Sequence, residues 1–212
     1  MKTILHLILA GLLSLVLVAH GADERARWPI KTSVPMPMEG AAVVSFDELV
    51  SLQLPPDPRK TTAKGDSTYQ SKRYPPFPNP LGLREGSMVS LTGYLHLVAY
   101  ENDGDYLIQI SASPTDGNNG IIVKVPPESE GPAELHRYFA AVRRFVRDRL
   151  LRGKEPSSGG NVMDHPPYVE VVGQLFLDDS HLKGPPRGKR KMKAATLWEI
   201  HPVVGIRFAP RK

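Results

Sequence analysis

Five side chains able to bind a metal or exchange protons lie in the C-terminal part of the chain. Asp178, Asp179 and His181 follow one apolar segment, while Glu199 and His201 lie within the next. Glu199 and His201 share a face of a strand, because side chains two residues apart point the same way. Zinc accepts histidine and carboxylate ligands, so these five residues are the candidates for a metal site.

The spacing of these residues argues for a structural role instead. No tight ligand pattern such as His-Glu-x-x-His is present, and we therefore predict that no metal is bound. In the alternative, Asp178 and Asp179 begin a turn, and the polar face at Glu199 and His201 hydrogen-bonds to the preceding loop.

Other catalytic patterns are missing from the chain. There is no cysteine, so thiol nucleophiles, disulfides and cysteine-based zinc sites are excluded. No Gly-x-Ser-x-Gly elbow, Gly-x-Gly-x-x-Gly turn or phosphate loop occurs. We therefore predict a protein that is not an enzyme and has no cofactor.

Positive charge is concentrated in the second half. Residues 22–130 hold 10 Lys/Arg and 14 Asp/Glu, whereas residues 131–212 hold 16 and 8. This asymmetry favours an anionic partner. Part of it lies in the segment 178–196, whose cations are Lys183, Arg187, Lys189, Arg190, Lys191 and Lys193. Binding of phosphates by such a loop would weaken with salt, and a purely solvated loop is the alternative.

Alternating apolar residues predict the strands that must position this loop. The predicted strands are Ser87–Ala99, Tyr106–Ser111, Ile121–Val125, Tyr168–Leu177 and Leu197–Phe208. In the first of them Val89, Leu91, Leu95 and Leu97 are expected to face inward. Gly93 falls on that apolar face and suggests a bulge or bend.

Two helices are predicted between and before these strands. The longer one begins at Pro132, which suits a first helical position, and ends before Gly153. Its apolar stripe includes Leu135, Phe139, Val142 and Val146, and arginines occupy the rest of its surface. A short helix follows Ser45, which forms a capping box with Glu48 and precedes Pro55.

The N-terminal part divides into two segments. Residues 1–21 have a basic start, an apolar run over Ile4–Val18 and a small-residue end, the layout of a secretory signal peptide. The run of about 15 residues is short for a transmembrane helix, so no membrane span is expected after cleavage. Residues 22–85 are predicted to form a proline-rich arm, and residues 86–208 the folded domain. We expect export to the periplasm or the exterior.

The order strand, strand, strand, helix, strand, strand, with Gly93 in the first strand, resembles the OB-fold, the oligonucleotide/oligosaccharide-binding barrel. We therefore expect a mainly β fold with one long helix and a five-stranded OB-fold-like barrel. The sequences Gly173–Asp178 and Leu197–Val203 also resemble those of small exported bacterial proteins, a likeness that names no activity.

The OB-fold resemblance implies where a ligand would bind. In such proteins it lies across the second and third strands, between the first hairpin loop and the loop joining the last two strands. Here those loops are Glu101–Asp105 and Asp178–Thr196. The outward side chains between them would be Tyr94, His96, Gln109 and Lys124, which adds them to the loop cations as candidate anion-binding residues.

Secreted staphylococcal-type nucleases share the OB-fold, and their Asp-Gly-Asp-Thr turn is similar to Asp103-Gly104-Asp105-Tyr106. Here Tyr106 replaces the threonine. The segment Ser111–Val125 also lacks the arginine and the Asp-Thr-Pro-Glu-like run that clamp phosphate and supply the base. The turn is therefore interpreted as a hairpin.

Together these patterns predict an exported binding module without enzymatic activity. Its basic side would contact an anionic polymer, nucleic acid included, or an acidic surface of the cell envelope. Two alternatives remain: a protein-interaction module that uses the proline-rich arm, and a metal-dependent hydrolase or nuclease.

Overall fold

The structure is a computed structural model and describes residues 25–36, 38, 40–56, 68–182 and 186–210. The predicted signal peptide and Lys183 lie outside these residues. The elements in chain order are α2 (Trp28–Lys31), β1 (Ala42–Val44), α3 (Phe46–Ser51), β2 (Met88–Tyr100), β3 (Tyr106–Ser111), β4 (Gly120–Val125), α4 (Ala133–Phe145), η1 (Val146–Leu150), β5 (Asn161–Val162), β6 (Tyr168–Leu177), η2 (Asp179–His181) and β7 (Ala194–Phe208).

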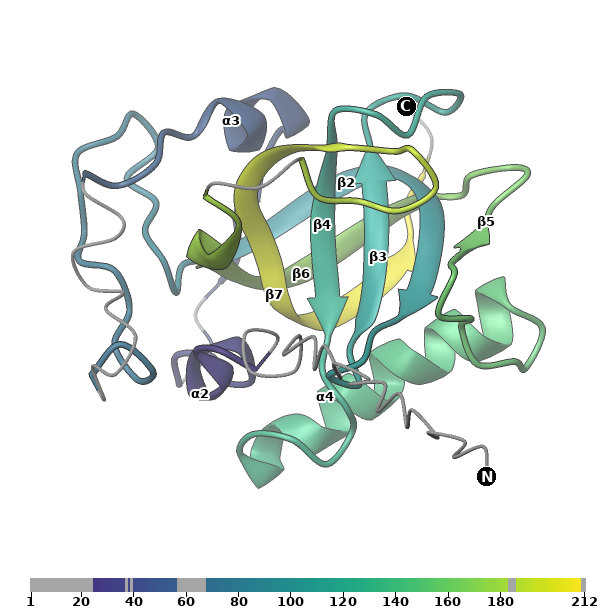
Figure 1. Ribbon diagram of the computed structural model, residues 1–212, viewed down its shortest axis with the longest axis horizontal. Coiled ribbons are helices and arrows are strands. Elements are labelled where there is room, and N and C mark those ends of the chain that lie inside the picture. The colour runs from purple at the N-terminus through teal and green to yellow at the C-terminus, as the bar shows by residue number, and fades with distance from the viewer. Residues whose placement is uncertain (1–24, 37, 39, 57–67, 183–185, 211–212) are drawn as a thin grey trace, which may run out of the picture.

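Five strands form a closed barrel (Figure 1). They are hydrogen-bonded in the order β2-β3-β4-β7-β6, and β6 pairs again with β2 to complete the circle. The β4–β7 pair is parallel, and the other four pairs are antiparallel. The short strands β1 and β5 add to β2 from outside this circle. The predicted mainly β, OB-fold-like barrel with one long helix is thus confirmed.

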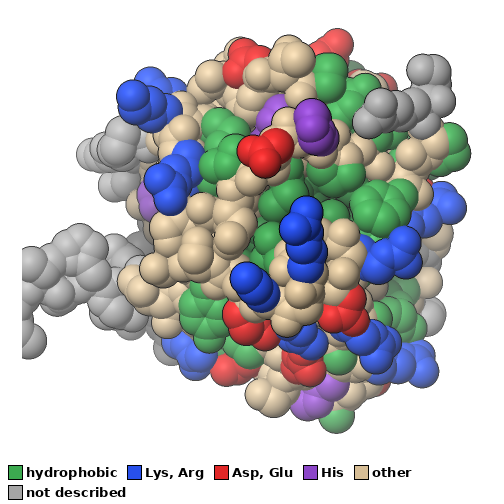
Figure 2. Space-filling model, turned by 90° about the vertical axis from the view of Figure 1, so that its right-hand side faces the viewer, with side chains coloured by type: hydrophobic (Ala, Val, Ile, Leu, Met, Phe, Trp, Pro, Cys, Tyr) green, Lys and Arg blue, Asp and Glu red, His purple; other side chains and the backbone are tan. Residues whose placement is uncertain are grey.

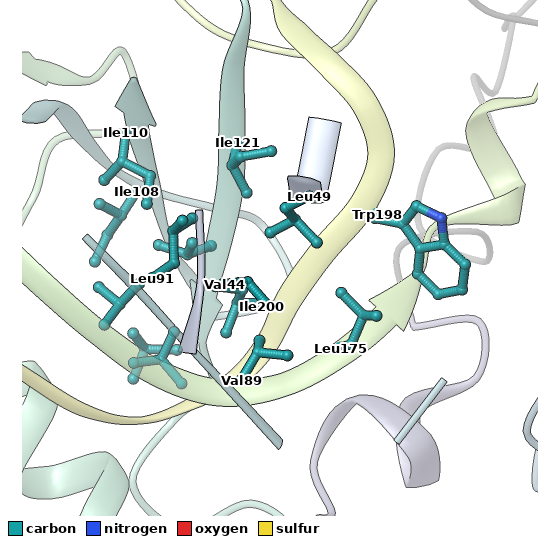
Figure 3. Close-up of a cluster of buried hydrophobic side chains, with 14 of the residues drawn as sticks. Val44, Leu49, Val89, Leu91, Ile108, Ile110, Ile121, Leu175, Trp198 and Ile200 are labelled. Atoms are coloured by element: carbon teal, nitrogen blue, oxygen red, sulfur yellow. The ribbon is translucent and has the colours of Figure 1, made fainter. Parts of the chain in front are cut away.

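The inward faces of the strands make one apolar core. Figure 3 shows side chains from the barrel strands converging with residues of the N-terminal segment. The labelled residues come from all five barrel strands and from β1 and α3: Val44, Leu49, Val89, Leu91, Ile108, Ile110, Ile121, Leu175, Trp198 and Ile200. All are buried. The alternation predicted for β3 and β4 is therefore correct, since a pleated strand places every second residue on one face.

The alternation predicted for β2 fails at its centre. The β2–β3 register shifts between Leu95 and Leu97, which is where the bulge lies, rather than at Gly93. One extra residue reverses the faces. Val98 consequently points into the core, while Leu97 joins Ala99 and Ile122 in a separate apolar cluster. The expectation that Leu97 faces inward was wrong.

A similar shift changes the end of β7. Register irregularities between β6 and β7 fall between Val172 and Leu175. Val203 takes the core position, and Val204 packs instead with Leu135 and Phe139 of α4. Alternation through Trp198 and Ile200 predicts Val204 on the same face of the strand, and this prediction was wrong. Val204 and these two helix residues belong to a separate apolar cluster, through which α4 packs on the barrel.

Helix α4 closes one end of the barrel beneath β3 and β4 (Figure 1). Its last turn is π-helical, and the Gly153 N–H closes it by donating to the Arg147 carbonyl at 2.8 Å. Arg143, expected on the surface, is buried and donates to the Gly104 carbonyl at 2.9 Å. Its guanidinium lies 3.5 Å from the centroid of the Tyr106 ring. This arginine joins the helix to the first hairpin loop.

The described parts of the N-terminal segment pack on the barrel. The predicted capping box of α3 is present, with Ser45 and Glu48 bonding reciprocally. Leu49 is buried in the main core, and the Phe77 ring stacks on Trp198 with centroids 6.2 Å apart. Among the described residues, no helix has the length and apolarity needed to cross a membrane.

Candidate binding site under the basic loop

The loop between β6 and β7 lies across the outer face of the barrel, over β3 and β4 (Figure 1). Gln109 of β3 anchors it: its side-chain oxygen accepts from the Lys189 N–H at 2.6 Å, and its amide nitrogen donates to the Met192 carbonyl at 3.3 Å. The Gly120 N–H donates to the Lys193 carbonyl at 3.0 Å. The loop is therefore held on the face where the OB-fold resemblance placed a ligand.

Glycine is required where the loop turns close to its own backbone. Gly188 has φ +137°, and a Cβ built there would lie 2.0 Å from the Met192 carbonyl oxygen. Contacts under 3.0 Å of this kind cannot be relieved without moving backbone, so any larger residue would displace the loop.

Of the five predicted loop cations that lie within the described residues, two turn inward. Arg187 pairs with Asp178 at 2.8 Å and with Glu199, and Lys189 pairs with Glu101 at 2.7 Å. Arg190, Lys191 and Lys193 remain exposed. Arg190 Nε donates to the Gly159 carbonyl at 2.9 Å, which fixes its position without neutralising it. We call Arg190, Lys191 and Lys193 the loop tip.

The side chains expected to contact a ligand between the two loops also have partners within the protein. His96 is buried, its Nε2 lying 2.8 Å from the Ser113 carbonyl oxygen and 2.9 Å from Ser111 Oγ. The Tyr94 ring packs on Tyr168 with centroids 4.9 Å apart. Lys124 lies between Asp103 and Asp105, with its Nζ 3.7 Å from an oxygen of each.

The metal-ligand candidates have separate partners. Asp179 accepts from the hydroxyls of Tyr69 at 2.9 Å and Tyr74 at 2.6 Å. Asp178 Oδ2 lies 2.6 Å from His181 Nδ1. In the described part of the chain, no three His, Asp or Glu side chains are grouped so that they could hold a metal ion. The five candidates are not assembled into one site, whereas Glu199 does contact the loop through Arg187.

A pocket of about 450 Å³ opens beneath the loop. Leu107 of β3 and Ile122 of β4 form its apolar part, and both belong to the outer cluster with Leu97. Besides Pro186 and Gly188, the rest of the lining consists of charged groups and one histidine: Glu101, Lys124, Asp178, His181, Arg187, Lys189 and Glu199. Both cations and carboxylates therefore line the wall.

A buried chain of charged groups continues from this wall into the protein. Glu199 Oε2 lies 3.5 Å from His201 Nδ1, and His201 Nε2 lies 3.3 Å from Asp105 Oδ2. The Asp105 carboxylate is in turn 3.7 Å from Lys124 Nζ. His201 and Asp105 are completely buried, and both side chains are without a hydrogen-bond partner among the described residues.

Burial dominates the proton affinities in this cluster. It raises the pKa of Asp105 to about 7, an effect that the Lys124 ammonium opposes. Burial also lowers the pKa of His201 well below its usual value, and Lys124 and Lys31 lower it further. Burial opposes ionisation of Asp178 too, but Arg187 and His181 outweigh it and lower the pKa of that carboxyl. His201 is consequently neutral at pH 7, whereas Asp105 titrates near neutrality.

Sequence reasoning missed Asp105 and Lys31 as members of this cluster. Asp105 was compared with a nuclease turn and then interpreted as part of a hairpin, and Lys31 lies in an unpredicted four-residue helix. Lys31 and Asp105 are far apart in the chain, so no short stretch of sequence indicates that both are buried in one cluster.

The exposed charge forms no single basic patch on the face shown in Figure 2. Lys and Arg side chains are spread among acidic, histidine and hydrophobic ones. Any contact made there with an anion would use small groups of cations, such as those carried by one loop.

No family model matches the chain, and no curated protein matches it. The OBody AM3L09 bound to hen egg-white lysozyme is 14% identical, with a TM-score of 0.32 over 60% of this chain and 86% of that one. The asparaginyl-tRNA synthetase of Entamoeba histolytica is 11% identical, with a TM-score of 0.31 over 60% of this chain and 22% of that one. Similarities this low carry no argument about function.

Proposed function

We propose that this protein is an exported, non-enzymatic binding module of the OB-fold superfamily that contacts an anionic polymer through its loop tip. The observation that carries the proposal is the exposure of Arg190, Lys191 and Lys193 on a loop that is fastened to the barrel. A fastened loop loses little conformational entropy on binding, and preorganised cations bind anions more favourably for that reason.

The charge pattern supports the same side of the molecule. Three exposed cations within four residues raise the local potential even though the wider surface is mixed. Export rests on the sequence of residues 1–21. Nucleic acid belongs to the same ligand class but is not the default polymer outside the cytoplasm.

The proline-rich segment favours an interaction module less well. Tyr74 and Leu83 are buried, and Phe77 stacks on Trp198, so the described stretch around Pro75–Pro80 lies against the barrel. Polyproline ligands are recognised as extended segments that dock into another protein's groove. The prolines themselves, Pro75, Pro76, Pro78 and Pro80, are exposed, but Tyr74 and Phe77 hold the stretch to the barrel and limit the sides from which a partner can reach it.

Retention on immobilised heparin tests the proposal. We expect retention at low ionic strength and elution by moderate salt, because each neutralised anion releases a counterion. Passage through the column unretained at low salt contradicts it.

A further inference from the structure

The pocket beneath the loop contains an ammonium group with unused hydrogen-bond donors. Lys124 extends from the outer face of β4 into the pocket wall, with 13% of its side chain exposed. Its two ion-pair distances are 3.7 Å, longer than the 2.7–3.2 Å of a hydrogen bond. In the described structure its three N–H groups make no hydrogen bond, so they remain open to a ligand.

Charge balance decides when an anion can enter. The cations around the cluster are Lys31, Lys124, Arg143, Arg187 and Lys189. The carboxylates are Glu101, Asp103, Asp105, Asp178 and Glu199. The two sets cancel, and an added anion would make the region negative. If one carboxylate takes up a proton, the region carries one net positive charge, which favours binding of the anion.

The position of His201 identifies where that proton is held. Its imidazole stands between Glu199 and Asp105, 3.5 and 3.3 Å away. A neutral imidazole has one N–H and can satisfy one carboxylate only. The second contact becomes a hydrogen bond when Asp105 carries a proton and donates it to the ring. Asp105 is suited to this, because burial raises its pKa to about 7, Asp103 adds to that rise, and Lys124, Lys31 and Arg143 oppose it.

We propose that this pocket binds one small tetrahedral oxyanion of the phosphate or sulfate class, with Lys124 as its anchor and Asp105 taking up one proton. Protonation of Asp105 removes one of the two carboxylates that attract the Lys124 ammonium, which then donates to the oxyanion. Lys189 and His181 lie on the same wall and provide further donors. This site is separate from the loop tip and does not depend on the polymer.

Calorimetric titration of the purified chain with inorganic sulfate tests the site, since sulfate does not titrate between pH 6 and pH 8. We expect affinity about tenfold higher at pH 6 than at pH 8, the change produced when binding requires a proton on a group with a pKa near 7. Asp105→Asn, which cannot ionise, should bind with the same affinity at both pH values. Lys124→Met should lose binding, with folding checked by its unfolding transition.

Three outcomes overturn the proposal: no sulfate binding at pH 6, an unchanged pH dependence in Asp105→Asn, or unchanged affinity in a folded Lys124→Met variant. The variant Arg190→Gln/Lys191→Gln/Lys193→Gln separates this site from the proposed polymer site. Its sulfate affinity should equal that of the native chain, and a loss there would assign the anion to the loop tip instead.

Discussion

Arg27 and Glu85 form a fully buried two-pronged ion pair between the N-terminal segment and the start of the barrel. The guanidinium donates to the two carboxylate oxygens at 2.9 and 2.6 Å. Glu85 also accepts from the N–H groups of Tyr74 and Leu177, at 2.7 and 3.1 Å. The carboxylate therefore joins three segments that are distant in sequence.

Replacing Arg27 by alanine should destabilise the protein by about 3–5 kcal/mol, because Glu85 would be left as a buried charge without its partner. Urea unfolding measures the change. Arg207 provides the control, since it pairs with Glu170 at the surface and 73% of its side chain is exposed. Arg207→Ala should cost less than about 1 kcal/mol, and equal costs for the two variants would contradict the prediction.

Asp105 should make stability depend on pH. Its folded-state pKa of about 7 lies above the unfolded value of about 3.9, so the folded state binds more protons between these limits. The contribution is complete below pH 4 and is lost as pH rises to 7. The difference in unfolding free energy, Asp105→Asn minus native, should increase by roughly 3 kcal/mol from pH 5 to pH 8. Denaturant unfolding at both pH values measures it, and a constant difference would show that Asp105 ionises normally.

Neutralising the loop tip should weaken polymer binding. We expect Arg190→Gln/Lys191→Gln/Lys193→Gln to elute from heparin at clearly lower salt, because three phosphate-type contacts and their released counterions are removed. The matched control removes the same charge from exposed positions on α4 and η1, namely Arg137, Arg144 and Arg149. That control should elute near the native position, and the reverse order would move the binding surface to the helix.

Gly188→Ala should displace the loop from the outer face of the barrel. The new Cβ would collide with the Met192 carbonyl at a φ that side chains rarely adopt. We expect a loss of about 1–3 kcal/mol, measured by thermal unfolding, together with faster proteolysis of the loop. Gly40→Ala is the control, since a Cβ there has no neighbour within 4 Å. It should leave both properties unchanged.

The candidate site was only partly predictable. The sequence identified the loop cations but did not separate Arg187 and Lys189, which pair inward, from the three tip residues that stay exposed. All five have similar neighbours along the chain. Their difference arises from Asp178, Glu199 and Glu101, which reach them only after the barrel closes.

The sequence by itself determined the local elements: the five strands, the long helix and the capping box at Ser45. Strand alternation, helical spacing and capping depend only on residues close together in the chain, so short segments of sequence suffice to predict them. It could not place the bulge that reverses Leu97, because a register shift depends on the partner strand. Only the tertiary structure brought together Arg27 with Glu85, and Asp105 with His201. Burial and pairing between distant residues set the charge of those groups, and no local pattern records them.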